Sequence, residues 1–442
     1  MAKKKMTLEE KLEEAIVKDV PYEVPGNWMF VKLVNLLSSM TTKKPNKDEE
    51  FFRYIDIDAI DNRNQKVSEP KIMEVNKAPS RASRELMEGD IVFSTVRPYL
   101  KNIALIPTEY KDCIASTGFY VCRCKEIISN KYLYYLLCSE RVINYYTSLM
   151  KGDNSPSIRK EEFENLIVPL PPLKEQQRIV DKIESLFEKL DKANELIEEA
   201  REDFEKRKSA VLEKAFRGEL TRAWRSNNLV DYNSTWTKQE FSNIAKVKSN
   251  LVKPQEFLKY PHIAPDNIEK KTGKLLDYRT IEEDNVKSAK HRFYPGQIIY
   301  SKIRPYLSKV VIVDFEGLCS ADMYPIETDL DTKYLYYYML SDTFVNFASN
   351  SGSRSVLPKI NQKELGKIIV PVCSINEQKE IVRILDKLLE EESRIEELTQ
   401  LEEQIELIKK SILAKAFRGQ LGTNCEDDES ALELLKKILS KE

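Results

Sequence analysis

Six short clusters of basic and polar residues are the strongest candidates for binding another molecule. They are SRASR (80–84), RPYLKN (97–102), GDNSPSIRK (152–160), KSAKHRF (287–293), RPYLSK (304–309) and SGSRSVLPK (351–359). An arginine guanidinium can form two hydrogen bonds to guanine, and an asparagine or glutamine amide can read adenine. Serine, lysine and backbone amides more often hold phosphates. These clusters therefore indicate contact with nucleic acid rather than a reaction centre.

The candidate DNA contacts are basic, polar and tyrosine side chains within those clusters. They are Arg81, Arg84, Arg97, Tyr99, Lys101, Asn154, Ser155, Arg159, Lys290, Arg292, Arg304, Tyr306, Lys309, Ser353, Arg354 and Lys359. RPYL occurs twice unchanged, which favours a structural or phosphate role over base reading. The loops at 152–160 and 351–359 differ in sequence but are both small and polar, so we expect DNA contact there. His291 has no second histidine nearby and is expected in a groove or at the surface rather than on a metal.

The residue types that support catalysis are scarce. The chain has two histidines and 12 glycines, which leaves little for His-based acid–base chemistry or glycine-rich phosphate loops. It contains no GxxxxGK[ST] sequence for an ATP site and no [DNS]PP[YF] sequence. Its seven cysteines form no CxxC pair, so neither a disulfide framework nor a zinc site is expected. We therefore expect this chain to carry no catalytic residue and to bind no metal or cofactor.

The sequence contains an internal repeat. AFRGEL (215–220) returns as AFRGQL (416–421), and EQQRIV (175–180) returns as EQKEIV (377–382). GDIVFSTVRPYL (89–100) likewise returns as GQIIYSKIRPYL (296–307). Matches in the same order along the chain predict two tandem copies of one unit. Each copy is expected to be a globular domain followed by a long helix.

Each globular half is expected to be a mixed α/β (α+β) domain. Residues 89–96 and 296–303 resemble a glycine turn followed by a strand. Residues 165–170 and 367–372 are short apolar strands ended by proline. Residues 130–146 and 332–347 are each expected to form one buried helix. Their tyrosines are expected to pack in the core rather than to stack on bases.

The two long helices carry the pattern of a coiled coil. No proline or glycine lies between Glu175 and Phe216, and apolar residues recur there at alternating four- and three-residue steps. The second helix begins with a capping box, Ser374 to Glu377. It holds one residue fewer, which predicts a local packing irregularity. The expected seam residues are Ile179, Ile183, Leu186, Leu190, Ile197, Phe204, Val211, Ile381, Leu388, Ile395, Leu398, Ile405 and Ile412.

AFRG is expected to end each long helix. Arg217 and Arg418 place positive charge where the helix dipole favours it. Gly218 and Gly419 permit the left-handed residue that terminates a helix. Because the two copies share these arginines, we assign them to structure rather than to base reading.

These features predict two tandem domains related by a pseudo-two-fold internal repeat and joined by an antiparallel coiled coil. About 40 residues per helix give a rod of roughly 60 Å, with one domain expected at each end. Such a rod suits the reading of two DNA half-sites at a fixed separation. The expected parts are an N-terminal helix (1–20), a first recognition domain (21–173), a central helix (174–217), a linker (218–230), a second recognition domain (231–373), a distal helix (374–418) and a C-terminal tail with a short helix (419–442).

The charge is balanced, with 70 Lys and Arg against 72 Asp and Glu. Neither globular half has a marked excess of basic residues. Because phosphate neutralisation supplies non-specific DNA affinity, we expect weak binding alone and dependence on partners. No apolar run approaches the roughly 20 residues of a membrane span, and the N-terminus lacks a secretory signal. A cytoplasmic location with no membrane contact is expected.

The order PLPPLKEQQRIVDKIESLFEKLD, AVLEKAFRGELT and then a second copy resembles the specificity subunits of type I restriction–modification systems. The resemblance covers nearly the whole chain, and the second copy departs from it with PVCSINEQ in place of PLPPLKEQ. It implies a non-catalytic subunit whose two target recognition domains each read half of a split double-stranded DNA sequence. It also implies two modification (methyltransferase) subunits docked on the coiled coil, together with restriction (translocase and nuclease) subunits. S-adenosylmethionine, ATP and Mg would then belong to those partners.

Two other classes of function fit the same architecture. One is a stand-alone two-domain sequence-specific DNA-binding protein without enzyme partners, which should bind its site tightly when purified alone. The other is an adaptor whose two domains bind proteins. A bipartite methylated DNA motif that depends on this chain would eliminate the adaptor.

Overall fold

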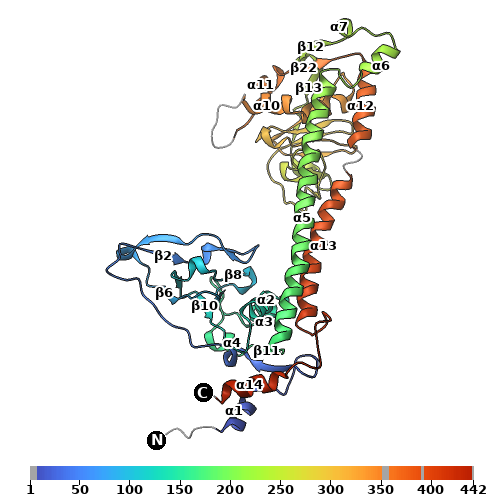
Figure 1. The fold of residues 1–442 in the computed structure, drawn as a ribbon. Helices are drawn as coiled ribbons and strands as arrows, with labels where there is room; N and C mark the ends of the chain where they lie inside the picture. The colour runs from blue at the N-terminus through green and yellow to red at the C-terminus, as the bar shows by residue number, and fades with distance from the viewer. Residues whose placement is uncertain (1–6, 351–357, 390–392, 441–442) are drawn as a thin grey trace. The chain divides into compact units, whose positions relative to one another are not determined.

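The computed structural model describes residues 7–350, 358–389 and 393–440. It divides into two compact units. Unit 1 holds residues 1–195 and 400–442, and unit 2 holds residues 196–399. Both are coloured along the chain in Figure 1, and each is considered by itself below.

The described part of unit 1 contains a mixed α/β domain with four sheets, one of which is the two-stranded hairpin of β3 (Ile60–Asp61) and β4 (Lys66–Val67). A central sheet has the order β10-β7-β8, and a second sheet has the order β5-β2-β9-β6, in which β2 and β9 run parallel. A third pairs β1 with β11. The strands are β1 (Met29–Lys32), β2 (Phe51–Ile55), β5 (Lys71–Glu74), β6 (Ala82–Glu85), β7 (Ile91–Ser94), β8 (Ile103–Leu105), β9 (Ile114–Ser116), β10 (Phe119–Cys122) and β11 (Ile167–Leu170).

Unit 2 repeats this plan. Its central sheet has the order β13-β21-β18-β19, and its second sheet has the order β14-β17-β20-β15-β16, with β15 and β20 parallel. Strand β12 pairs with β22 as β1 pairs with β11. The strands are β12 (Thr237–Glu240), β13 (Ala245–Val247), β14 (Leu251–Val252), β15 (Pro261–Ile263), β16 (Arg279–Thr280), β17 (Lys290–Phe293), β18 (Ile298–Ser301), β19 (Val310–Ile312), β20 (Gly317–Cys319), β21 (Met323–Thr328) and β22 (Ile369–Val372). The mixed α/β class and the internal repeat are confirmed.

The expected single helix at 130–146 is wrong, because each copy forms two helices there. Helix α2 (Asn130–Cys138) ends and α3 (Glu140–Leu149) begins at Ser139, whose ψ of 144° is extended. Helices α9 (Thr332–Leu340) and α10 (Asp342–Asn350) meet in the same way at Ser341. Each buried serine hydroxyl donates to the carbonyl three residues earlier, at 2.6 Å for Ser139 and 2.7 Å for Ser341. Serine side chains that bond nearby backbone compete with helix continuation.

The aromatic residues of these helices pack as expected. The hydroxyl of Tyr132 donates to Pro169 O at 3.0 Å, and that of Tyr334 donates to Pro371 O at 2.8 Å. Both tyrosines are fully buried. They fasten α2 and α9 to the strand that leads into each long helix, β11 and β22.

The first long helix, α5, runs from Leu173 to Phe216 over 44 residues. The distal helix was expected as one element, whereas the structure gives α12 (Ile375–Leu389) and α13 (Ser393–Ala416). Residues 390–392 between them lie outside the described residues.

The helices pair antiparallel within unit 1. Asp191 of α5 accepts from Lys409 at 2.8 Å, and Glu175 near the start of α5 is reached by the chain at Thr423 and Asn424. Earlier residues of α5 therefore contact later residues of the chain at α13 and beyond, which makes the two helices antiparallel. In Figure 1 this part of α5 and α13 lies side by side.

Most of the expected seam residues whose side chains are described are buried or half-buried. Ile179 and Ile183 share the unit 1 core with Ile412, and Leu186 and Leu190 pack against it. Ile197, Ile381 and Ile405 are also buried, while Phe204 and Val211 are half-buried. The seam assignment of Leu388 is wrong, because it is 40% exposed, whereas Leu385 on the same helix is buried. The side chains of Ile395 and Leu398 lie outside the described residues.

The chain termini form a helical pair in unit 1. The expected N-terminal helix is α1 (Leu8–Ala15), and the expected C-terminal helix is α14 (Ala431–Leu439). They contact each other, and Lys11 Nζ donates to Leu439 O at 3.1 Å. In unit 2 the expected linker contains a short helix, α6 (Arg222–Asn227). Within the described residues, the search for a helix able to cross a membrane finds none.

The AFRG segments end α5 and α13 as predicted. Gly218 and Gly419 have φ of +73° and +69°, the left-handed conformation expected after a helix. The phenylalanine of each segment docks on a buried tyrosine, with ring centroids 5.3 Å apart for Phe216 and Tyr334 and 5.4 Å for Phe417 and Tyr132. The segment therefore ends the helix and also anchors that end in a domain core.

Replacing Gly419 by alanine should destabilise unit 1 more than the same change at Gly422. Both have φ of +69°, but a Cβ on Gly419 would lie 2.4 Å from Pro25 Cδ, whereas one on Gly422 would meet nothing within 4 Å. We expect Gly422→Ala to cost about 1 kcal/mol for the left-handed backbone. Gly419→Ala should lose a further ~1–3 kcal/mol through overpacking. Urea unfolding followed by tryptophan fluorescence measures both, and equal losses would contradict the collision.

Candidate nucleic-acid interface

The RPYL turn has the same strained backbone in both units. Arg97 precedes the 3-10 turn Pro98–Leu100 and has φ of 49° and ψ of 60°, while Arg304 precedes Pro305–Leu307 with φ of 48° and ψ of 60°. The left-handed region costs a residue with a Cβ roughly 1 kcal/mol, and a following proline disfavours the right-handed helical region. The backbone N–H groups of Arg97 and Arg304 donate to Pro156 O and Pro358 O, both at 2.8 Å.

The turn lies against the neighbouring polar loop, so two predicted clusters come together. Arg97 Nη2 donates to Asn154 O at 2.9 Å, and Val96 forms a β-bridge with Ser157. In unit 2, Ile303 forms the corresponding bridge with Lys359. Ser353 and Arg354 of the predicted unit 2 loop lie outside the described residues.

The SRASR cluster lies close to the turn in unit 1. Thr117 N donates to Arg81 O at 2.9 Å, and Thr95 N donates to Gly118 O at 3.0 Å. These bonds connect Arg81, through the β9–β10 turn, to the residues that enter RPYL. Arg81 is exposed, whereas Arg84 is half-buried on β6 and its Nε has no partner within the described part of the chain.

Two predicted contacts in unit 2 are already engaged within the domain: Lys290 is buried, and Arg292 is half-buried. Lys290 is 8% exposed, and its Nζ donates to the backbone and side chain of Ser288 at 3.1 and 2.6 Å. Burial lowers the pKa of this ammonium. Arg292 is ion-paired with Glu316 and lies 5.1 Å from the ring centres of Phe257 and Tyr294. The prediction that Lys290 contacts DNA is therefore wrong. The guanidinium of Arg292 is held by its ion pair and by the aromatic rings.

His291 is buried at 4% exposure, so its expected place at the surface or in a groove is wrong. Burial is the main cause of its lowered pKa. No group of three or more possible metal ligands occurs among the described residues.

Three other predicted lysines hold intramolecular contacts. Lys101 pairs with Glu140 at 2.7 Å, and Lys359 pairs with Asp322 at 3.0 Å. Lys309 Nζ donates to Pro265 O at 2.6 Å and its side chain is 15% exposed. The remaining described candidates are exposed: Arg81, Arg97, Tyr99, Asn154, Ser155, Arg159, Arg304 and Tyr306.

Sequence reasoning missed Lys302, which stands beside the RPYL turn of unit 2. Its Nζ donates to Ala321 O at 2.7 Å and lies 3.9 Å from Asp322 Oδ1. Its position in GQIIYSKIRPYL, two residues before Arg304, was the available signal.

A buried Glu-Gln pair at the start of each long helix was also missed as a site, although its repetition was visible. In unit 1, Glu175 is fully buried and accepts from Trp28 Nε1 at 2.7 Å and Asn424 Nδ2 at 2.8 Å. Gln176 accepts from Ser129 N at 2.7 Å and donates to Ile127 O at 3.0 Å. The pair thus joins α5 to the start of α2 and to the segment after α13.

Unit 2 uses the same pair with different partners. Glu377 accepts from Arg225 Nη1 at 2.5 Å and from Thr221 Oγ1 at 2.6 Å. Gln378 accepts from Asp331 N at 2.9 Å, at the start of α9. The predicted capping box is therefore half right: Ser374 Oγ accepts from Glu377 N at 3.3 Å, but the carboxylate turns inward.

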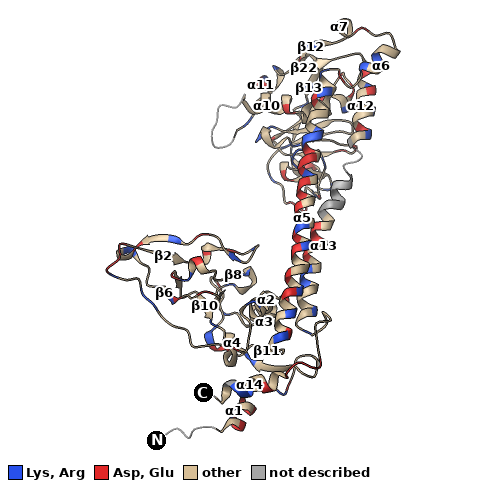
Figure 2. Cartoon of the chain, viewed as in Figure 1, with Lys and Arg blue, Asp and Glu red and all other residues tan. Residues whose placement is uncertain are grey.

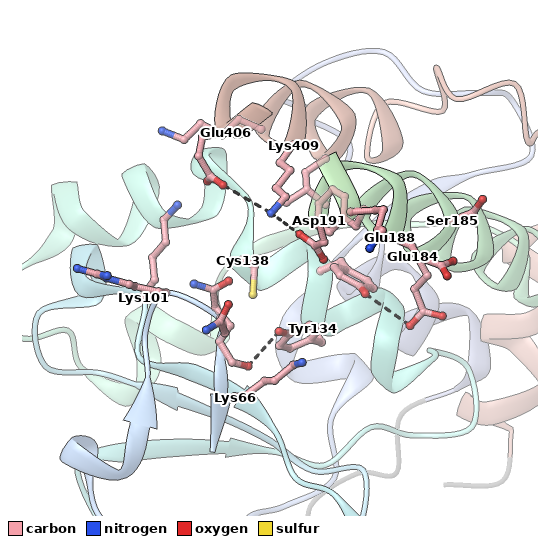
Figure 3. A pocket seen from close by; sticks show the side chains of 18 of the residues that line it. Lys66, Lys101, Tyr134, Cys138, Glu184, Ser185, Glu188, Asp191, Glu406 and Lys409 are labelled. Carbon is pink, nitrogen blue, oxygen red and sulfur yellow. Dashed lines mark hydrogen bonds and ion pairs between the residues drawn. The ribbon is translucent and has the colours of Figure 1, made fainter. Parts of the chain in front are cut away.

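A cleft of about 980 Å³ in unit 1 lies among α5, α13 and the hairpin of β3 (Ile60–Asp61) and β4 (Lys66–Val67). Figure 3 shows Glu184, Glu188 and Asp191 on the α5 side of this cleft, with Lys409 bonded to Asp191. Six basic and seven acidic side chains line the cleft, so its net charge does not favour phosphate. Figure 2 shows both signs of charge interleaved along α5.

Comparison with known proteins gives a consistent family. Residues 25–202 and 233–407 each match the type I restriction modification DNA specificity domain. The chain is 35% identical over 448 residues to the type I restriction enzyme EcoDI specificity subunit of Escherichia coli, covering 94% of this chain and 95% of the relative.

Solved structures agree with that family. A chain from a study of complex assembly and conformational transition of the type I R-M system is 26% identical with a TM-score of 0.74, covering 91% of this chain and 100% of its own. The HsdS subunit of Thermoanaerobacter tengcongensis is 26% identical with a TM-score of 0.55, covering 92% and 100%.

Removing the buried carboxylate of Glu377 should strongly destabilise unit 2. Glu377→Ala leaves the buried guanidinium of Arg225 without its ion pair, and breaking a buried pair costs ~3–5 kcal/mol. Glu380 on the same helix pairs with Arg383, which is 64% exposed. Glu380→Ala should therefore cost less than ~1 kcal/mol. Urea unfolding compares the two, and similar losses would contradict the role given to Glu377.

Proposed function

Because the matched specificity domains and the E. coli relative show that the chain belongs to the type I restriction–modification specificity subunits, we propose that each unit reads one half of a bipartite DNA sequence. The complex built on this chain would act where both halves occur at the right spacing. The proposed DNA-contacting surface of each unit comprises the RPYL turn and the neighbouring polar cluster.

The observation that carries this proposal is one scaffold built twice with different surfaces. Sheets, helix starts and the RPYL backbone correspond between units. In unit 1 the turn faces Asn154 through the contact of Arg97 with its carbonyl. Beside the turn of unit 2 lie Lys302, Asp322 and Lys359, joined by ion pairs, at positions that hold Thr95, Gly118 and Ser157 in unit 1. Equal scaffolds with unequal polar groups suit recognition of two different half-sites.

The balanced charge favours work within a complex over the stand-alone alternative. Formal net charge is -2, so phosphate neutralisation by this chain alone is limited. We propose that modification subunits supply further DNA contacts together with S-adenosylmethionine and the methylating site. Restriction subunits would supply ATP- and Mg-dependent steps, and this chain would be non-catalytic.

An apolar stripe on α13 supports docking of the modification subunits on the long helices. Leu401 is 42% exposed, Leu407 63% and Ile408 46%, although α13 already buries Ile405 and Ile412. At roughly 100° per residue, Leu401 and Ile408 lie within about 60° of the buried Ile405 and Ile412, so they widen the apolar face beyond the buried seam. A wide apolar face fits a bundle with further helices. On α12 of unit 2, Leu388 is 40% exposed. Its failure as a seam residue is consistent with the same role.

Genome-wide mapping of methylated motifs tests the function and the spacer together. In cells that also make the modification subunits, this chain should direct methylation to one bipartite motif. Four residues inserted after Glu199 lengthen α5 by about 6 Å and should change the gap by about one or two base pairs. The same insertion after Leu229, which is 95% exposed between helices, should leave the gap unchanged. Altered half-sites in the α5 variant would contradict the division between spacer and readers.

Charging the apolar stripe should weaken assembly with the modification subunits. Leu401→Lys with Ile408→Lys should lower co-purification roughly tenfold or more, because central apolar anchors each contribute over ~1 kcal/mol. Glu403 lies about 200° around the helix from Leu401 and is exposed. Glu403→Lys is the matched control and should assemble normally. Normal assembly of the double variant would remove this face from the interface.

A further inference from the structure

The two copies of the RPYL strand–turn provide an internal comparison between domains expected to read different sequences. Residues 89–100 and 296–307 share a glycine, an isoleucine, a serine and the RPYL run. The fold explains the buried ones. Ile91 and Ile298 are fully buried, and Ser94 Oγ and Ser301 Oγ donate to the carbonyls of Val96 and Ile303 at 2.8 and 3.1 Å.

Burial does not explain the arginine and tyrosine of the run. Tyr99 is 46% exposed and Tyr306 is 48% exposed, and both arginines are exposed. Arg97 and Arg304 also occupy left-handed backbone, where glycine or asparagine would fit with less strain. An arginine retained twice at such a position indicates that its side chain has a use outside the domain core.

Four of the other candidate cations already have partners within their own unit. Lys101, Lys309, Lys359 and Arg292 are held by carboxylates or carbonyls. Within the described ranges, neither Arg97 nor Arg304 forms an ion pair, and Arg97 makes one hydrogen bond to the carbonyl of Asn154. Most of the guanidinium donors therefore remain available for an oxyanion, which arginine can bind through two parallel bonds.

We propose that the pairs Arg97–Tyr99 and Arg304–Tyr306 are matching phosphate anchors, one for each half-site. Two domains that read different bases have the sugar–phosphate backbone in common, and phosphate contacts set position without carrying sequence information. The anchor then fixes the height of each domain on the duplex, and the differing loop beside it reads bases. This inference rests on the proposed function, and it assigns to these residues affinity without specificity.

The test uses the assembled complex with its modification subunits on duplexes that contain or lack the mapped motif. Arg97→Gly and Arg304→Gly keep the left-handed backbone while removing the side chain, which protects folding. Each should weaken binding to both duplexes by a similar factor, roughly tenfold. Each should also reduce the slope of log affinity against log salt by about 0.9. The methylated motif should be unchanged.

Arg217→Ala is the matched control. Arg217 is also exposed and shared with the other copy as Arg418, but it already lies 3.7 Å from Glu213 on α5. It should alter neither affinity nor salt slope. Arg97→Lys should restore most of the slope and part of the affinity, because it keeps the charge but loses the fork geometry.

Three results would overturn the anchors. A changed base preference in the half-site would make these arginines base readers. Loss of modification subunits from the purified variants would make the turn a protein contact. Unchanged affinity and slope would remove the contact altogether. Failure of the proposed function is distinguishable, because the unaltered complex would then show no bipartite motif.

Discussion

A buried carboxylate at the start of each long helix is the constraint on which both units depend. Glu175 and Glu377 are fully buried, and a buried charge is costly unless it is paired or hydrogen-bonded. Their partners come from chain segments far away in sequence: Asn424 for Glu175, and Thr221 with Arg225 for Glu377. Each domain is therefore closed by the segment that follows a long helix. The neighbouring Gln176 and Gln378 extend this junction to the starts of α2 and α9.

The two junctions are equivalent without being identical. In unit 1 the indole of Trp28 donates to Glu175. In unit 2 the guanidinium of Arg225 donates to Glu377 Oε1. Within the described residues, Trp236 Nε1 and Glu377 Oε2 lack a hydrogen-bond partner. Thr221 and Thr423 keep corresponding roles, at 2.6 and 3.4 Å from their carboxylates. The two copies therefore use different donor groups to bond the buried glutamate, while the glutamate keeps its place at the start of a long helix.

Sequence reasoning succeeded where a pattern repeats over many residues. The tandem copies, the extent of α5 and the glycine ends of α5 and α13 follow from periodicity and duplication. Prediction failed where a side chain forms a hydrogen bond or ion pair other than the one its sequence position suggests. Ser139, whose hydroxyl donates to Leu136 O, separates two helices where one was predicted. The carboxylate of Glu377 pairs with Arg225 and does not complete the predicted capping box. Lys290 was predicted to contact DNA, but its side chain is buried and its ammonium is bonded to Ser288. Such outcomes depend on tertiary neighbours that spacing does not reveal.

The placement of the junctions explains how recognition can vary while architecture stays fixed. The groups that close each unit lie where β11 and β22 lead into their long helices, whereas the RPYL turns follow β7 and β18 and pack against α3 and α10. No hydrogen bond among the described residues joins Glu175 or Glu377 directly to the RPYL turns or their neighbouring loops. Residues such as Asn154 or Ser155 can therefore change without disturbing the closure, since their substitution removes no partner of a buried charge. A change at Glu175, Gln176 or Thr423 would instead disturb the scaffold whatever sequence the unit reads.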